Sequence, residues 1–182
     1  MAVLIPIYWH YYGPLNFLWL SDMGLFLTTL GLWLHMPVMI SMAVVGVMVM
    51  ELIWCVDYFV QLISGYNIID LSDYMFDGAY PMMLRGLSLF HVAMPVIWIL
   101  YLMHYGYDKR AVWYMTFLYW IIMIYTYTLT KPLANVNWVY LTTINPLLGL
   151  ASNVWLILLM ILFPLCVFWP THYLCTKLFK RA

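Results

Sequence analysis

Long apolar runs dominate the sequence and restrict the folds that are open to it. A helix needs about 20 mostly apolar residues to cross the hydrocarbon core of a bilayer. Five stretches are that long: 14–34, 37–63, 82–104, 111–130 and 153–175. Only 8% of the 182 residues are charged, whereas soluble domains carry about a quarter. The sequence therefore predicts an all-α polytopic transmembrane helix bundle over 1–182, a single domain with five spans.

Two longer stretches separate the predicted spans, 64–81 and 131–152. The second contains "NWVYLTTINPLLGL", which is apolar enough for a short re-entrant or sixth helix at 138–150. The N-terminal "MAVLIPIYWHYYGPL" has neither a basic region nor a small-residue cleavage site, so we expect it to belong to the mature chain. Cys55, Cys166 and Cys175 have no pairing or metal spacing and are expected to be packing residues.

The placement of basic residues predicts the orientation of the bundle. Lys109 and Arg110 follow the third predicted span, and Lys177, Lys180 and Arg181 follow the fifth. Cytoplasmic loops carry the excess of lysine and arginine in membrane proteins. We therefore expect a cytoplasmic C-terminus and an outer N-terminus. The 64–81 stretch, with three aspartates and no basic residue, is then outside as well.

Polar side chains gather in the outer half of the predicted bundle. The predicted spans and outer loops contribute Ser21, Asp22, Glu51, Asp57, Arg85, Ser88, His91, Asn135 and Asn137. Ionisable groups at membrane depth are costly and by default indicate a functional site. Two interpretations stay open. One is a structural network in which Arg85 pairs with Asp57 or Glu51, and the other is an outward-facing catalytic or binding pocket.

A second set of polar residues lies near the inner ends of the predicted spans. Three histidines at one depth, His35, His104 and His172, are one way to bind a metal or a b-type haem. Interfacial histidines also reach toward the headgroups without any ligand. Because no i, i+4 histidine pair or carboxylate partner supports a metal, we expect no metal and no cofactor.

Several stretches resemble known membrane proteins. "GPLNFLWLSDMGLFLTTLGLWL", "MISMAVVGVMVMELIWCVDYF", "YMFD" and "RGLSLFHVAMP" resemble a group of small bacterial multi-pass proteins labelled only as membrane-associated. This resemblance implies a bacterial inner membrane as the location. "LFHVAMPVIWILYLM" is similar to the helix of the androgen-induced transmembrane hydrolases in which a catalytic histidine precedes an apolar gap and a proline. "TKPLANVNWVYLTTINPLL" resembles the segment that follows there, and its Asn135-Val136-Asn137 resembles the Asn-x-Asn motif of acyltransferase-like membrane proteins.

The hydrolase resemblance implies a reaction and assigns roles. That family cleaves fatty-acid esters of hydroxy fatty acids with an intramembrane threonine and histidine. His91 matches the histidine, and Ser21 stands near the place of the threonine, a departure that keeps the hydroxyl. Ser21 would then attack an ester carbonyl and His91 would take its proton. Glu51 or Asp57 would orient His91, and Asn137 or Arg85 would stabilise the oxyanion.

Two other function classes stay open at this point. The chain is also consistent with a structural or accessory subunit of a larger membrane complex, or with a protein that binds haem or quinone through the inner histidines. Lipids are the expected partners in every case. If the chain is an accessory subunit, other membrane subunits are expected partners as well. The formal net charge of +0 gives no reason to expect nucleic acid.

Overall fold

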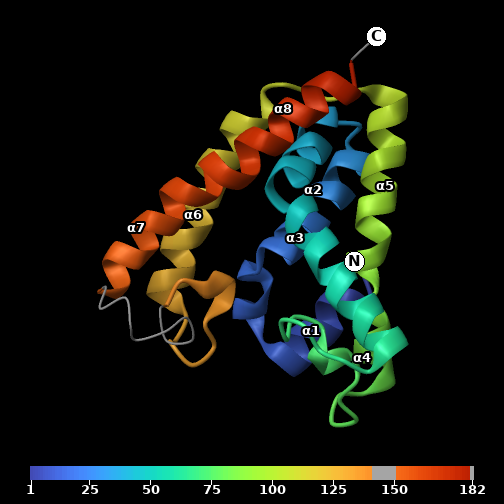
Figure 1. Cartoon of the computed structure of the whole chain (residues 1–182), viewed down its shortest axis with the longest axis vertical. Coiled ribbons are helices and arrows are strands. Elements are labelled where there is room, and N and C mark those ends of the chain that lie inside the picture. Colours follow the sequence, from blue (N-terminus) through green and yellow to red (C-terminus); the bar gives the residue numbers. More distant parts are fainter. Residues whose placement is uncertain (141–150, 181–182) are drawn as a thin grey trace.

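The computed structural model describes residues 1–140 and 151–180, and these ranges are helical with no strand (Figure 1). The helices are α1 (Leu4–Tyr12), α2 (Leu20–Trp33), α3 (Pro37–Ser64), α4 (Met82–Leu87), α5 (Phe90–Tyr105), α6 (Ala111–Leu129), α7 (Ser152–Phe163) and α8 (Trp169–Leu178). Three short 3-10 turns are η1 (Pro14–Leu18), η2 (Asp73–Met75) and η3 (Val136–Trp138), and the π-helical η6 (Pro164–Phe168) joins α7 to α8. The predicted all-α architecture is confirmed.

Four helical segments are long and apolar enough to cross a membrane. They are Pro37–Ser64, Met82–Tyr105, Ala111–Leu129 and Ser152–Leu178. Each corresponds to one of the predicted spans, so a membrane-embedded helix bundle is confirmed. The predicted element at 138–150 lies for the most part outside the described residues.

The first predicted span, 14–34, has a different structure. Gly13 turns the chain with φ 78°, Pro14–Leu18 form a 3-10 turn, and only Leu20–Trp33 are α-helical. The 14 residues of α2 are about 21 Å long, short of the roughly 30 Å hydrocarbon core. A fifth crossing therefore stays a prediction.

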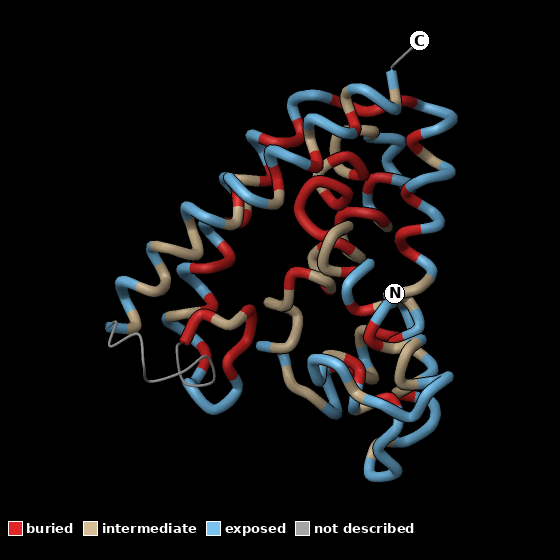
Figure 2. Tube along the Cα trace, viewed as in Figure 1, coloured by how far each residue is buried: buried red, intermediate tan, exposed pale blue. Residues whose placement is uncertain are grey.

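Helix α3 is the centre of the bundle. It contacts α2, α5, α6 and α8, and the buried residues in Figure 2 concentrate on it and on the helix faces around it. Ile40 and Val44 of α3 pack with Trp98 of α5 and Met115 of α6, all 1% exposed or less. The outward faces of the other helices are apolar and exposed, as expected where the neighbours are lipid tails.

Hydrogen bonds between distant segments define the two ends of the bundle. At one end the Tyr107 N–H donates to the Phe179 carbonyl, which brings the α5–α6 loop to the C-terminal end of α8. At the other end the Leu20 N–H donates to the Asn137 side chain, which brings η3 to the start of α2. The basic residues that follow α5 and α8 therefore lie together, opposite the loop between α3 and α4 (Figure 1).

A proline explains the π-helical segment in the last span. Pro164 has no N–H, so the carbonyl of Met160 lacks its ordinary α-helical donor. Trp120 of α6 donates its indole N–H to that carbonyl at 2.8 Å, and the Tyr119 hydroxyl donates to the Leu159 carbonyl at 3.2 Å. Side chains of α6 thus satisfy backbone groups that a lipid environment would leave unpaired.

Helices α2 and α3 approach closely at a glycine. A Cβ built on Gly31 would lie 2.8 Å from Ile40 Cγ1 and 3.1 Å from Met39 Cβ. Small residues allow this kind of close contact between helices in membranes. Gly31 therefore fixes how tightly the short α2 packs on the central helix.

We expect Gly31→Ala to destabilise the protein by about 1–3 kcal/mol, because the added methyl must displace side chains that are already packed. The thermal midpoint in a neutral detergent measures the loss. Gly86→Ala is the matched control, since a Cβ at Gly86 meets nothing within 4 Å. Equal midpoints for both variants would show that the contact at Gly31 does not limit packing.

Candidate functional site

A cavity of about 420 Å³ lies where α1, α2, α3 and the start of α5 meet, at the end of the bundle that carries the α3–α4 loop. Six of the nine residues proposed from the sequence line it: Ser21, Asp22, Glu51, Ser88, His91 and Asn137. Asp57, Arg85 and Asn135 do not line it. Most of its remaining wall is aromatic or apolar.

The centre of this site is a hydrogen bond between α3 and α5. His91 Nδ1 lies 2.6 Å from Glu51 Oε2, and the two side chains are 12% and 1% exposed. With an ionised Glu51 the Nδ1 atom carries the proton and donates it, which leaves Nε2 as an acceptor. The carboxylate that orients His91 is therefore Glu51, one of the two candidates from the sequence.

The backbone of α5 holds His91 in place through a proline. Pro95 lies one turn after His91 and has no N–H, so the His91 carbonyl loses its α-helical donor. The Cys55 thiol of α3 lies 3.5 Å from that carbonyl and donates to it. Cys55 is thus more than a packing residue, because it links α3 to the His91 backbone one turn from Glu51.

Ser21 and Asp22 enter the cavity from the first turn of α2. Asp22 is 3% exposed, and its Oδ2 accepts a hydrogen bond from Asn16 Nδ2 at 3.0 Å, while Oδ1 has no partner in the described structure. Ser21 lines the same cavity as His91, but no hydrogen bond joins the two residues. The expected direct contact between nucleophile and base is therefore not present in this structure.

The Asn137 side chain binds the backbone at the start of α2, and all its hydrogen-bonding groups have partners. Its Oδ1 accepts from the Leu20 N–H at 3.0 Å, and its Nδ2 donates to the Leu18 carbonyl at 2.8 Å and to Thr126 Oγ1 at 3.4 Å. An amide with both N–H groups occupied has none left for an oxyanion. The predicted oxyanion role of Asn137 is not supported.

The Asn135 side chain does not line the cavity. Its Oδ1 accepts a hydrogen bond from the Tyr140 N–H.

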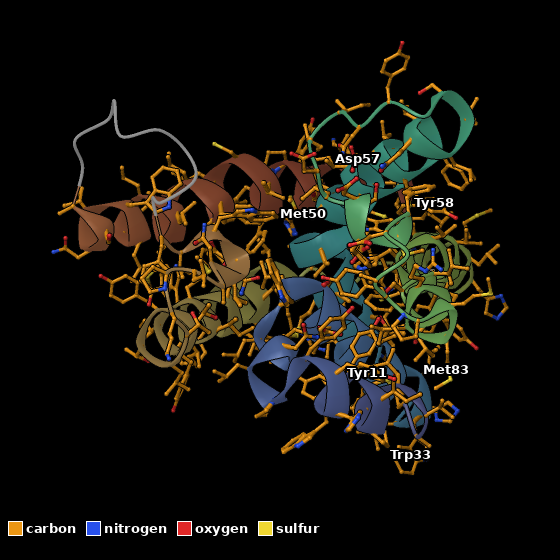
Figure 3. All side chains as sticks on the ribbon, turned by 90° about the horizontal axis from the view of Figure 1, so that it is seen from below. Tyr11, Trp33, Met50, Asp57, Tyr58 and Met83 are labelled. Atoms are coloured by element: carbon orange, nitrogen blue, oxygen red, sulfur yellow. The ribbon has the colours of Figure 1, made fainter. Side chains whose placement is uncertain are left out.

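The predicted ion pair of Arg85 with Asp57 or Glu51 is wrong. Asp57 is 1% exposed and accepts five hydrogen bonds from the loop after α3: four backbone N–H groups of 68–72 and the Ser72 hydroxyl, at 2.8–3.3 Å. Figure 3 shows Asp57 beside this loop. Arg85 donates to the Met75 carbonyl at 3.2 Å. Loop amides compete successfully for Asp57 because they are local and numerous.

Aromatic residues form a part of the site that the sequence reasoning missed. The Trp54 ring stacks on the His91 ring with centroids 4.5 Å apart, and its buried indole N–H lies near the Tyr74 hydroxyl, to which it is a donor. Tyr8 from α1 shares a 2.8 Å hydrogen bond with Ser88. The i, i+3 spacing of Glu51 and Trp54 was a usable signal, whereas nothing in the sequence places α1 against α4.

Burial keeps the tyrosine phenols of this wall neutral. Desolvation raises the pKa of Tyr8 and of Tyr74 far above the ordinary value for a phenol, and raises the pKa of Tyr12 to about 12. The Asp22 carboxylate also raises the pKa of Tyr8 and of Tyr12, because a second negative charge beside it is unfavourable. These hydroxyls therefore act at neutral pH as hydrogen-bonding groups and not as bases.

The three inner histidines do not converge. His172 Nδ1 lies 2.8 Å from the Tyr107 hydroxyl, while His35 and His104 are exposed. Within the described ranges no group of three or more histidine, cysteine, aspartate or glutamate side chains is placed to hold a metal ion. This geometry gives no support to the haem alternative.

Comparisons of the chain with protein-family models, with curated proteins and with solved structures found no match. The resemblances read from the sequence therefore stay predictions, and the function has to be argued from the geometry of the cavity.

We expect Asp57→Asn to loosen the loop after α3, because an amide offers one acceptor oxygen where the carboxylate offers two. Losing two or three of the five hydrogen bonds is expected to cost about 1–3 kcal/mol. Hydrogen exchange of the 66–76 amides should accelerate, and the thermal midpoint should fall. Asp77→Asn is the control, because exposed Asp77 accepts only from the Ala79 N–H two residues on. Unchanged exchange in Asp57→Asn would contradict this role.

Proposed function

We propose that the chain is an integral membrane enzyme that hydrolyses or transfers the acyl group of a lipid ester, with Ser21 as nucleophile, His91 as base and Glu51 as the group that orients His91. The observation that carries the proposal is the 2.6 Å Glu51–His91 hydrogen bond in the wall of a cavity that Ser21 also lines. A carboxylate–histidine pair facing a hydroxyl is the general arrangement for acyl transfer.

The proposed chemistry uses the three side chains in turn. Ser21 Oγ attacks the ester carbonyl carbon, and its proton passes to His91 Nε2, the nitrogen that Glu51 leaves free. The leaving alcohol takes that proton, and water then releases the acyl group by the reverse sequence. Such a base contributes roughly 10²–10⁴-fold to the rate. Ser21 and His91 close on each other with substrate between them, since catalytic contacts are often long in the unliganded state.

The Trp54 indole takes the place of the oxyanion donors expected from the sequence. Asn137 has both N–H groups occupied, and Arg85 lies outside the cavity lining. Trp54 lines the cavity, its buried N–H lies near the Tyr74 hydroxyl of the same wall, and its ring stacks on His91. A donor fixed beside the base, in a site of low dielectric constant, is suited to stabilise the developing charge.

The proposed site opens to the outer side of the membrane. The end of the bundle with the cavity also carries the α3–α4 loop and its aspartates. At the opposite end, Lys109 and Arg110 follow α5, Lys177 lies in the last turn of α8 and Lys180 follows that helix. The positive-inside rule then assigns the cavity end to the outside, with a cytoplasmic C-terminus. An odd number of crossings, with α2 as the first, also puts the N-terminus outside.

Labelling by a fluorophosphonate probe tests the reaction. We expect wild-type protein in neutral detergent to be labelled, and Ser21→Ala and His91→Ala to lose the label. Glu51→Gln should reduce the labelling rate at least tenfold, because His91 loses its anionic partner. Thr29→Ala is the matched control, since that α2 hydroxyl bonds to the Leu25 carbonyl and not to the cavity.

Two outcomes would overturn the enzyme proposal. Wild-type protein that never labels, or Ser21→Ala that labels as well as wild type, would leave the Glu51–His91 pair as a structural link. The accessory-subunit alternative would then take first place.

Reporter fusions test the orientation. A fusion after residue 182 should be active on the cytoplasmic side, and one inserted at Gly65 should be active on the outer side. Gly65 is exposed, ends α3 with φ 74°, and a Cβ there meets nothing within 4 Å, so an insertion is well placed. Activity of both fusions on the same side would refute the arrangement.

A further inference from the structure

We infer that the cavity binds an organic ammonium group, so that the substrate class of the proposed reaction is an ester whose headgroup carries a positively charged amine. This inference rests on the site of the proposed function, but it concerns binding and does not depend on Ser21 as a nucleophile. The argument uses three features of the cavity wall: its charge, its unpartnered oxygen atoms and its aromatic rings.

The charged groups of the wall are almost all acidic. Asp22 and Glu51 lie inside it and Asp70 is exposed at its edge, while His91 is the one basic side chain among the described lining residues. His91 is already bonded to Glu51, so no basic side chain of the wall is left to pair with Asp22. A positively charged ligand would supply the missing counter-charge.

Two carboxylate oxygens in this wall have no hydrogen-bond partner in the described structure. They are Asp22 Oδ1 and Glu51 Oε1, from residues that are 3% and 1% exposed. The other oxygen of each carboxylate is bonded, to Asn16 and to His91 respectively. A buried carboxyl oxygen without a donor is costly, so the wall is complementary to a ligand that brings positive charge or N–H donors.

The rest of the wall selects an organic cation over a metal ion. Eight aromatic side chains line the cavity together with the acidic pair: Tyr8, Tyr12, Trp19, Trp54, Tyr74, Tyr80, Phe90 and Trp138. Ring faces attract weakly hydrated cations, and aromatic cages are a known way to bind quaternary ammonium groups. Hard metal ions instead require several oxygen ligands at short distance, and the described residues hold no such cluster.

The apolar part of the wall indicates what the ammonium is attached to. Leu20, Val47 and Met50 line the cavity beside the acidic residues. The wall therefore has an acidic and aromatic part and an apolar part. An amphiphile fits both, with its amine among the carboxylates and rings and its acyl chain toward the bilayer. The Trp54 N–H, a donor in the same wall, is then available to an ester oxygen of the same molecule.

The test compares choline with 3,3-dimethylbutan-1-ol, which has nearly the same shape and no charge. Isothermal titration of the full chain in a neutral maltoside detergent should show saturable binding of choline, with the uncharged alcohol at least tenfold weaker. Asp22→Asn should weaken choline binding at least tenfold, because it removes the charge at nearly constant shape. Asp77→Asn should bind as wild type does.

The outcomes separate this inference from the proposed reaction. Equal binding of choline and the alcohol by wild type would overturn it without any variant, as would displacement of choline by millimolar Mg²⁺. Ser21→Ala should lose the fluorophosphonate label and keep choline binding. A protein that binds choline but never labels refutes the reaction alone, and one that labels but does not discriminate charge refutes the ammonium site alone.

Discussion

The hydrogen bond between Glu51 and His91 is the constraint around which this bundle is arranged. Each residue alone would place an ionisable group among apolar helices, which costs several kcal/mol. Together they share one short bond and join the central helix to α5. The neighbouring features follow from that bond: Trp54 stacks on the imidazole, and the Cys55 thiol binds the His91 carbonyl that Pro95 has freed. A proline one turn after the histidine therefore has a structural use, because it provides a backbone acceptor where α3 passes.

The same rule governs the polar groups elsewhere in the chain. A lipid environment supplies no hydrogen bonds, so each backbone group released by an irregularity needs a partner within the protein. Trp120 meets this need at Met160, and Asn137 meets it where the chain leaves η1 and enters α2. Asp57 does so for a whole loop, by accepting five hydrogen bonds. The polar residues are thus of two kinds: those whose atoms are fully used in holding the fold, and those that keep unused atoms facing the cavity.

This division explains how much of the molecule the sequence could predict. The apolar runs predicted four spans correctly, because length and hydropathy are sufficient for long regular helices. They missed the start of the predicted span 14–34. Its first residues, Pro14–Leu18, are mostly apolar but form a 3-10 turn before α2 begins. The shared depth of the polar residues pointed to the right region, since six of the nine proposed residues line one cavity. The pairing of Arg85 was wrong because charge and depth alone ignore the loop amides, which lie nearer to Asp57 in the sequence. The aromatic wall was missed because α1 folds back against α4, and no periodicity in the sequence reports that contact.

The unused atoms are what distinguish a site from a structural network here. In a purely structural network each buried donor and acceptor would be satisfied, as they are at Asn137 and Asp57. Around the cavity, one oxygen of Asp22 and one of Glu51 are left without partners in the described structure. Both lie on lining residues, next to the histidine whose second nitrogen is also free of the Glu51 bond. Two unused acceptor oxygens on acidic residues form a pattern that a ligand with an ammonium group would satisfy. Among the residues described, the unpaired buried carboxylate oxygens all lie in the wall of this cavity. Arg85 Nε is also unpaired, but Arg85 lies outside the cavity lining.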